Sequence, residues 1–114
     1  MLIVEDDEGI GFVLAEIISQ ETPYDALLVT NGLDALQAVR AMRPGLLLLD
    51  YRLPGMNGIE LYDHLQRLEG REGIPVILMS ATLPYQEIAQ RQVIGMKKPL
   101  DLDDLLQTIE HLIQ

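Results

Sequence analysis

The chain has 114 residues, 48% of them hydrophobic, and a formal net charge of −10. This length predicts one domain, residues 1–114, with a full hydrophobic core. The acidic charge argues against direct binding to nucleic acid, and no apolar run approaches the ~20 residues of a membrane span. Cysteine is absent, which excludes disulfides, zinc–thiolate sites and thiol catalysis. No basic segment precedes an apolar one as in a secretory signal, so we expect a cytoplasmic protein.

Strand-like and helix-like patterns alternate along the chain. The expected strands are the apolar runs at residues 1–4, 26–29, 46–50, 76–79 and 93–97. The expected helices carry apolar residues at helical spacing within residues 10–18, 36–42, 61–68, 84–92 and 101–113. The fourth helix has few apolar positions and should be short. The fifth has the strongest amphipathic pattern, with Asp101 as its N-cap.

Five strands alternating with five helices predict an α/β fold, a parallel five-stranded sheet with helices on both faces. Right-handed crossovers leave few topologies, and the flavodoxin-like (βα)5 order 2-1-3-4-5 is the common one at this length. In that order the first and third strands are neighbours, and a crevice opens beyond their carboxyl ends.

Acidic residues come directly after two of the expected strands. Glu5 and Asp6 follow the first strand, and Asp50 ends the third. Parallel strands bring their carboxyl ends to one edge, where these carboxylates would repel one another unless a cation sat among them. The pattern predicts a divalent-metal site with a reactive aspartate. Lys98, at the end of the last strand, would place a positive charge opposite Asp50. For Asp7 we expect only a helix-capping role.

Five features in order make the chain resemble the receiver domain of bacterial two-component response regulators, a resemblance that runs from Met1 to Gln114. They are Val4-Glu5-Asp6-Asp7, Asp50, Pro54-Gly55-Met56-Asn57-Gly58, Ser80-Ala81 and Lys98-Pro99. The resemblance implies a signalling switch, in which Asp50 accepts a phosphoryl group from a histidine kinase. It also implies that Lys98 pairs with that carboxylate and that Ser80 donates to a phosphoryl oxygen.

The same resemblance implies a magnesium ion and the residues that bind it. Asp6 and Asp50 would bind Mg²⁺ directly, Glu5 largely through water, and the backbone carbonyl of Arg52 would complete the protein ligands. Such a set suits magnesium, which prefers oxygen ligands and keeps several waters. The resemblance further implies a cis bond between Lys98 and Pro99.

The partners implied are a histidine kinase or phosphotransfer protein, with an effector domain or output protein downstream, and a homodimer stays open. A receiver catalyses only its own phosphorylation and dephosphorylation, so we do not expect an enzyme. A haloacid-dehalogenase-like phosphatase would require a second acidic residue two positions after the nucleophilic aspartate, and Arg52 occupies that position here. In a nucleotide-binding module, the glycine fingerprint that begins with Gly9-Ile10-Gly11 would require glycine or alanine at position 14. That position is Leu14 here. A pseudo-receiver that only binds proteins is the remaining alternative.

Two departures from the family pattern concern the output of the switch. Gly95 stands where the family usually carries an aromatic residue that reports phosphorylation, and the stretch from Ser80 to Lys98 looks several residues shorter than usual. We therefore hypothesise that the aromatic coupling is not used, and that the signal leaves through the first helix or through residues 101–113.

Overall fold

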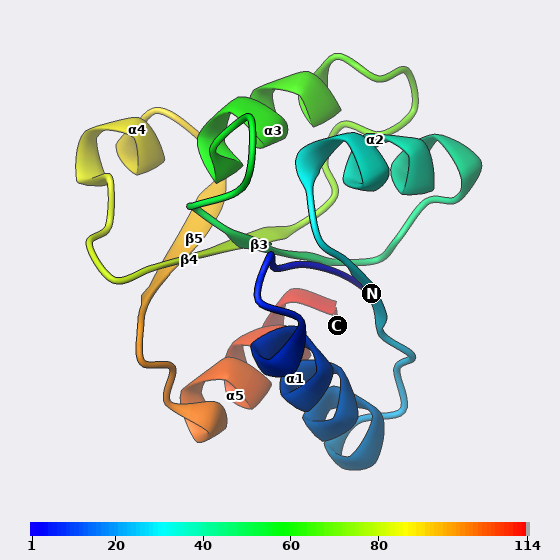
Figure 1. Ribbon diagram of the computed structural model, residues 1–114, viewed down its shortest axis with the longest axis vertical. Coiled ribbons are helices and arrows are strands. Elements are labelled where there is room, and N and C mark those ends of the chain that lie inside the picture. Colours follow the sequence, from blue (N-terminus) through cyan, green and yellow to red (C-terminus); the bar gives the residue numbers. More distant parts are fainter. Residues whose placement is uncertain (114) are drawn as a thin grey trace.

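The computed structural model describes residues 1–113, which form a five-stranded parallel sheet in the order β2-β1-β3-β4-β5 (Figure 1). The strands are β1 (Leu2–Val4), β2 (Leu27–Val29), β3 (Leu47–Asp50), β4 (Val76–Ser80) and β5 (Val93–Lys97). The helices are α1 (Glu8–Glu21), α2 (Gly32–Ala41), α3 (Gly58–Gln66), α4 (Tyr85–Ala89) and α5 (Leu102–Ile113). The fold class and strand order expected from the sequence are confirmed, and Gln114 lies outside the described residues.

Helices cover both faces of the sheet, α1 and α5 on one side and α2, α3 and α4 on the other (Figure 1). Successive strand residues face opposite sides, so neighbours in β3 join different cores. Leu47 and Leu49 belong to the core under α2 and α3, whereas Leu48 packs with residues of α1 and α5. Because β1, β3 and β4 are buried on both faces, they read as continuous apolar runs.

Element boundaries differ from the sequence expectations by a few residues. The second helix ends at Ala41, with Met42 as its C-cap, and the third ends at Gln66, so Leu68 lies beyond it. The fourth helix is shorter than residues 84–92, because only Tyr85–Ala89 are helical and none of these five residues is buried. The fifth strand, Val93–Lys97, has the bounds expected.

The apolar stripe of α1 is divided between the core and the surface. Leu14 and Ile18 are buried, as a core-facing stripe requires, but Ile10 and Val13 are 47% and 58% exposed. They line a groove of about 850 Å³ that also runs along Leu100 and Leu102 at the start of α5. Spacing alone makes these residues one face, and only the packing of α5 beside α1 decides which of them reach the core.

The sheet register and one close contact position the end of β3. Val4 of β1 lies beside Leu49 of β3, so the residues that follow these two strands emerge side by side. The backbone amide of Gly58 donates to the Tyr51 carbonyl at 2.7 Å, which holds the start of α3 against this strand end. A Cβ at position 58 would lie 2.7 Å from the Asp50 carbonyl oxygen, so this contact requires glycine.

No helix within residues 1–113 combines the length and the apolar character that crossing a bilayer requires.

Candidate functional site

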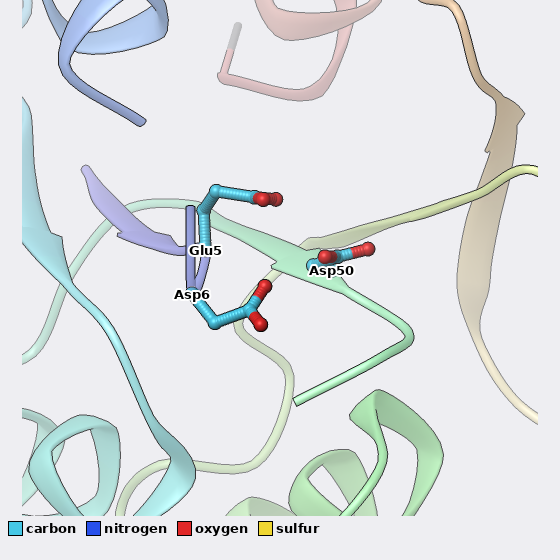
Figure 2. Close-up of side chains that lie close together, drawn as sticks. All are labelled: Glu5, Asp6 and Asp50. Atoms are coloured by element: carbon cyan, nitrogen blue, oxygen red, sulfur yellow. The ribbon is translucent and has the colours of Figure 1, made fainter. Parts of the chain in front are cut away.

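Three carboxylates meet at the carboxyl edge of the sheet (Figure 2). Glu5 and Asp6 follow β1, and Asp50 is the last residue of β3. One oxygen from each carboxylate lies within 4.8 Å of the others. Glu5 and Asp50 are buried, whereas Asp6 is exposed at the mouth of the site. The sheet topology therefore brings together the three acidic residues that the sequence singled out.

Lys98 lies between the two buried carboxylates. Its Nζ is 3.1 Å from Oδ1 of Asp50 and 3.3 Å from Oε2 of Glu5. Its backbone amide donates to the Ser80 carbonyl at 2.9 Å, which fixes the chain just after β5. The Lys98–Pro99 bond is cis, as expected from the resemblance. The pairing with Glu5 was not predicted from the sequence, where Lys98 was expected opposite Asp50 alone and Glu5 only beside the metal.

The site is electrostatically frustrated because it holds more negative than positive charge in a buried place. Burial, together with repulsion from Asp50, raises the pKa of Glu5 to about 7 even though Lys98 opposes the shift. Burial alone would lower the pKa of Lys98, but its hydrogen bond and charge interaction with Asp50 outweigh that and leave the pKa above its ordinary value. A cation of higher charge would relieve the remaining repulsion.

These carboxylates fit a magnesium ion. They are hard, anionic oxygen donors from two adjacent strand ends, and Asp6 leaves one side of the cluster open to water. Magnesium binds through one or two carboxylates and retains several waters, so a small, partly open donor set suits it. The role of the Arg52 carbonyl, which the resemblance supplied, stays a prediction.

Ser80 ends β4 next to the cluster, and its hydroxyl is engaged locally. The hydroxyl donates to the Thr82 carbonyl at 2.7 Å and receives the Thr82 amide at 3.3 Å. In this turn the Ser80 hydroxyl bonds to nearby backbone groups, a common local role of serine at a strand end. The same hydroxyl cannot donate to a ligand while it donates to the Thr82 carbonyl. Thr82 was not among the residues expected from the sequence, although a hydroxyl at a strand end followed by a loop is the signal for such a turn.

Asp7 has the capping role expected of it. Its side chain accepts a hydrogen bond from the Ile10 amide at 3.1 Å and so caps α1. Its backbone amide donates to Oε1 of Glu5 at 3.3 Å. The cap therefore also helps to hold one of the buried carboxylates in place.

Comparison with known proteins gives a consistent answer. Residues 1–110 match the family described as the response regulator receiver domain. The chain is 35% identical over 114 residues to sporulation initiation phosphotransferase F of Bacillus subtilis, covering 96% of this chain and 90% of that protein. It is 33% identical over 101 residues to the DNA-binding response regulator MtrA of Mycobacterium tuberculosis, but covers only 41% of that longer protein.

Solved structures agree with the sequence relatives. The signal receiver domain of a signal transduction histidine kinase from Syntrophus aciditrophicus superimposes with a TM-score of 0.86 at 26% identity. That alignment covers 98% of this chain and 87% of the other. A CheY-like receiver domain from Methylobacillus flagellatus has a TM-score of 0.88 at 24% identity, covering 97% and 95% of the two chains, and supports the fold alone.

Proposed function

The chain belongs to the response regulator receiver domain family of two-component signalling, and from that premise we propose that Asp50 is its phosphoacceptor. The observation that carries the proposal is the position of Asp50: it is buried at a strand end, 3.1 Å from the Lys98 ammonium and within one carboxylate cluster with Glu5 and Asp6. A strand-end aspartate used only for solubility would be exposed and would need no such partners.

In the proposed reaction, a carboxylate oxygen of Asp50 attacks the phosphorus of a phosphohistidine. The new O–P bond forms as the P–N bond breaks, and the donor imidazole leaves. Lys98 pairs with the carboxylate and then lies beside the oxygens of the transferred group. Ser80 supplies a hydroxyl for one of these oxygens.

We propose that Mg²⁺ occupies the carboxylate cluster, held by Asp6 and Asp50, with Glu5 acting through water and the Arg52 carbonyl as a further ligand. When bound, the ion supplies positive charge that offsets the repulsion between the phosphoryl group and the acidic site. The support for this assignment is the donor set itself, together with the pKa of Glu5, which burial and then repulsion from Asp50 raise.

The partner that we propose is a histidine kinase or a histidine phosphotransfer protein, in the cytoplasm. An apolar groove beside Lys98 gives such a partner a place to dock, lined by Ile10, Val13, Ile17 and Leu102. The acceptor is a residue of the domain itself and no external metabolite is turned over, so we do not propose an enzyme.

The output partner is less constrained than the phosphodonor. MtrA is described as DNA-binding and is more than twice as long as the part that this chain matches, whereas the Bacillus relative is matched over 90% of its length. A net charge of −10 makes direct contact of this domain with DNA unfavourable. An effector domain or a separate output protein would carry that step.

The family match over residues 1–110 favours a receiver over a haloacid-dehalogenase-like phosphatase. It disfavours a nucleotide-binding module in the same way. A pseudo-receiver would have no need of the paired Lys98 and Asp50.

The test is intact-mass measurement after incubation with acetyl phosphate and Mg²⁺. The wild type should gain one phosphoryl group that is lost in base, and Asp50→Asn should gain none. Asp103→Asn, which changes an exposed aspartate of α5, is the matched control and should be labelled like the wild type. Equal labelling of Asp50→Asn and the wild type would refute the assignment.

A further inference from the structure

The loop after β3 is fixed by backbone hydrogen bonds at its two ends but not in its middle. At its start the Tyr51 amide donates to the Met79 carbonyl at 2.8 Å, and at its end the Gly58 amide donates to the Tyr51 carbonyl at 2.7 Å. Within the described residues 1–113, no backbone-to-backbone hydrogen bond restrains residues 52–56. The Arg52 carbonyl, which we propose as a ligand of Mg²⁺, belongs to this stretch, so side-chain packing has to position it.

The side chain of Met56, in the same stretch, rests on the backbone of Gly32, the first residue of α2. A Cβ at position 32 would lie 2.7 Å from Sδ and 2.8 Å from Cγ of Met56, and its three nearest atoms all belong to that side chain. Gly32 is buried and Met56 is half-buried. The absence of a side chain at position 32 therefore leaves a gap that the thioether fills. Asn31 fixes this gap in space, because its side chain caps α2 by accepting from the Asp34 amide at 2.9 Å.

The contact between Met56 and Gly32 spans the strand that leads into Glu5 and Asp6. In the sheet, β1 lies between β2 and β3, and the contact joins the loop after β3 to the helix that follows β2. Both helices next to it, α2 and α3, lie on one face of the sheet (Figure 1). Met56 and Asp6 also line a common hollow of about 760 Å³. The contact is thus placed where it can hold the loop beside the carboxylate cluster.

We propose that Met56 is a positioning residue for the metal site: packed on Gly32, it holds the loop so that the Arg52 carbonyl can complete the ligands of Mg²⁺. The inference rests on the proposed metal site. Methionine suits the role because its unbranched chain fills irregular gaps. Loss of the contact would leave Asp6 and Asp50 in place, since neither belongs to the loop, and would release only the ligand that the loop carries. The affinity for Mg²⁺ should therefore fall without being abolished.

Isothermal titration calorimetry with MgCl2 on the folded domain measures this role. Met56→Ala should weaken Mg²⁺ binding about tenfold, the lower end of the roughly 10–100-fold loss seen when a group that orients a metal ligand is removed. Met56→Leu nearly conserves the side-chain volume and should restore most of the affinity. Met42→Ala, which truncates an exposed methionine at the C-cap of α2, is the matched control and should bind Mg²⁺ like the wild type.

A double-mutant cycle in EDTA tests the packing itself without any metal. Gly32→Ala should lower the free energy of unfolding of the wild type, because the new methyl group meets Met56. In the Met56→Ala background the same change should cost nothing, because the side chain that it would meet has been removed. Urea unfolding of the four proteins gives this coupling. In calorimetry, Gly32→Ala alone should weaken Mg²⁺ binding as Met56→Ala does, so it carries the affinity test if Met56→Ala does not fold.

The outcomes separate the positioning role from the metal site on which it rests. No Mg²⁺ binding by the wild type, or binding that Asp6→Ala leaves unchanged, would overturn the proposed metal site and the role of Met56 with it. Wild-type affinity in a folded but less stable Met56→Ala would show that Met56 only fills the core, which overturns the positioning role alone. A failure of Met56→Leu to restore the affinity, or an equal cost of Gly32→Ala in both backgrounds, would overturn it as well.

Discussion

At the scale of single residues, the site depends on how Lys98 serves two buried carboxylates at once. One ammonium cannot neutralise both Glu5 and Asp50, and the pKa of Glu5 is raised first by burial and then by repulsion from Asp50. Asp6 stands apart because it is exposed. It adds negative charge to the cluster without being needed to fill the core, which makes it the best residue for separating metal binding from folding.

Magnesium should stabilise the wild type, because it binds the folded cluster and not the unfolded chain. Linkage predicts about 2.7 kcal/mol when free Mg²⁺ is a hundredfold above its dissociation constant. Asp6→Ala should lose most of this gain, and without metal it should be at least as stable as the wild type because one repelling charge is removed. Urea unfolding in MgCl2 and in EDTA measures both quantities.

The matched control for that experiment is Asp25→Ala, which removes an exposed aspartate that precedes β2, away from the carboxyl edge. It should keep the full response to magnesium. If Asp6→Ala responds to magnesium as strongly as Asp25→Ala does, the ion binds elsewhere.

At the scale of elements, the start of α3 is tied to the strand that carries the phosphoacceptor. Asn57 and Glu60 form a reciprocal capping box, and Gly58 lies directly over the Asp50 carbonyl. The capping box fixes where the helix begins, and the glycine lets it begin this close to β3. The loop before α3 thus has a positioning role in addition to its turn geometry.

Gly58→Ala should therefore destabilise the protein, because its Cβ would meet the Asp50 carbonyl oxygen and Leu78 Cδ1, both at 2.7 Å. We expect a loss of about 1–3 kcal/mol in the free energy of unfolding, together with slower labelling of Asp50. Gly45→Ala is the control, since a Cβ there meets nothing within 4 Å and should leave stability unchanged or raise it by up to about 1 kcal/mol. Equal stability of the two variants in urea unfolding would contradict the packing argument.

The sequence predicts elements well where one local pattern decides them. The acidic ends of β1 and β3 were located because buried parallel strands are apolar and their carboxyl ends converge. The run Val93–Lys97 was located by its apolar residues, although none of them is fully buried. Contacts between elements far apart in the chain leave no such local pattern in the sequence, so they could not be predicted from it. The exposure of Val13 depends on where α5 packs, and the packing of Ile88 over Gly95 depends on where a weak helix lies.

The Arg91–Asp63 pair is another contact between elements that only the structure reveals, and it links α4 to α3. The hydrogen bond from Arg91 is the main cause that holds the pKa of Asp63 below its ordinary value. A carboxyl whose pKa is lower in the folded than in the unfolded protein contributes stability above the unfolded pKa of about 3.9, and that contribution disappears as pH falls through the folded pKa.

Asp63→Asn should accordingly lower the free energy of unfolding by roughly 0.2–1 kcal/mol at pH 7, the range for partly exposed pairs. The difference from the wild type should shrink as the pH is lowered below about 4. Urea unfolding of both proteins across this pH range measures it, with Asp103→Asn as an unpaired comparison. A difference that stays constant or grows on acidification would show that the pair is not the source of the effect.

At the scale of the whole molecule, the net charge of −10 acts on a body of only 32 × 31 × 28 Å. At 0.01 M salt the Debye length is about 30 Å, so charges on opposite faces still repel one another, whereas at 0.1 M it is about 10 Å. Like charge confined in a compact state destabilises that state. Screening should therefore be visible as a property of the whole fold, separate from any ion bound at Asp50.

In EDTA, the melting temperature should rise as NaCl increases from about 0.01 M to about 0.3 M, because the long-range repulsion is progressively screened. Tetramethylammonium chloride should have the same effect, since its bulky cation screens charge but cannot enter a cluster of carboxylates within 4.8 Å of one another. Thermal unfolding followed by circular dichroism measures both titrations. A rise with NaCl alone would instead indicate a specific cation at the cluster, and a falling melting temperature would mean that local ion pairs such as Lys98–Asp50 outweigh the global repulsion.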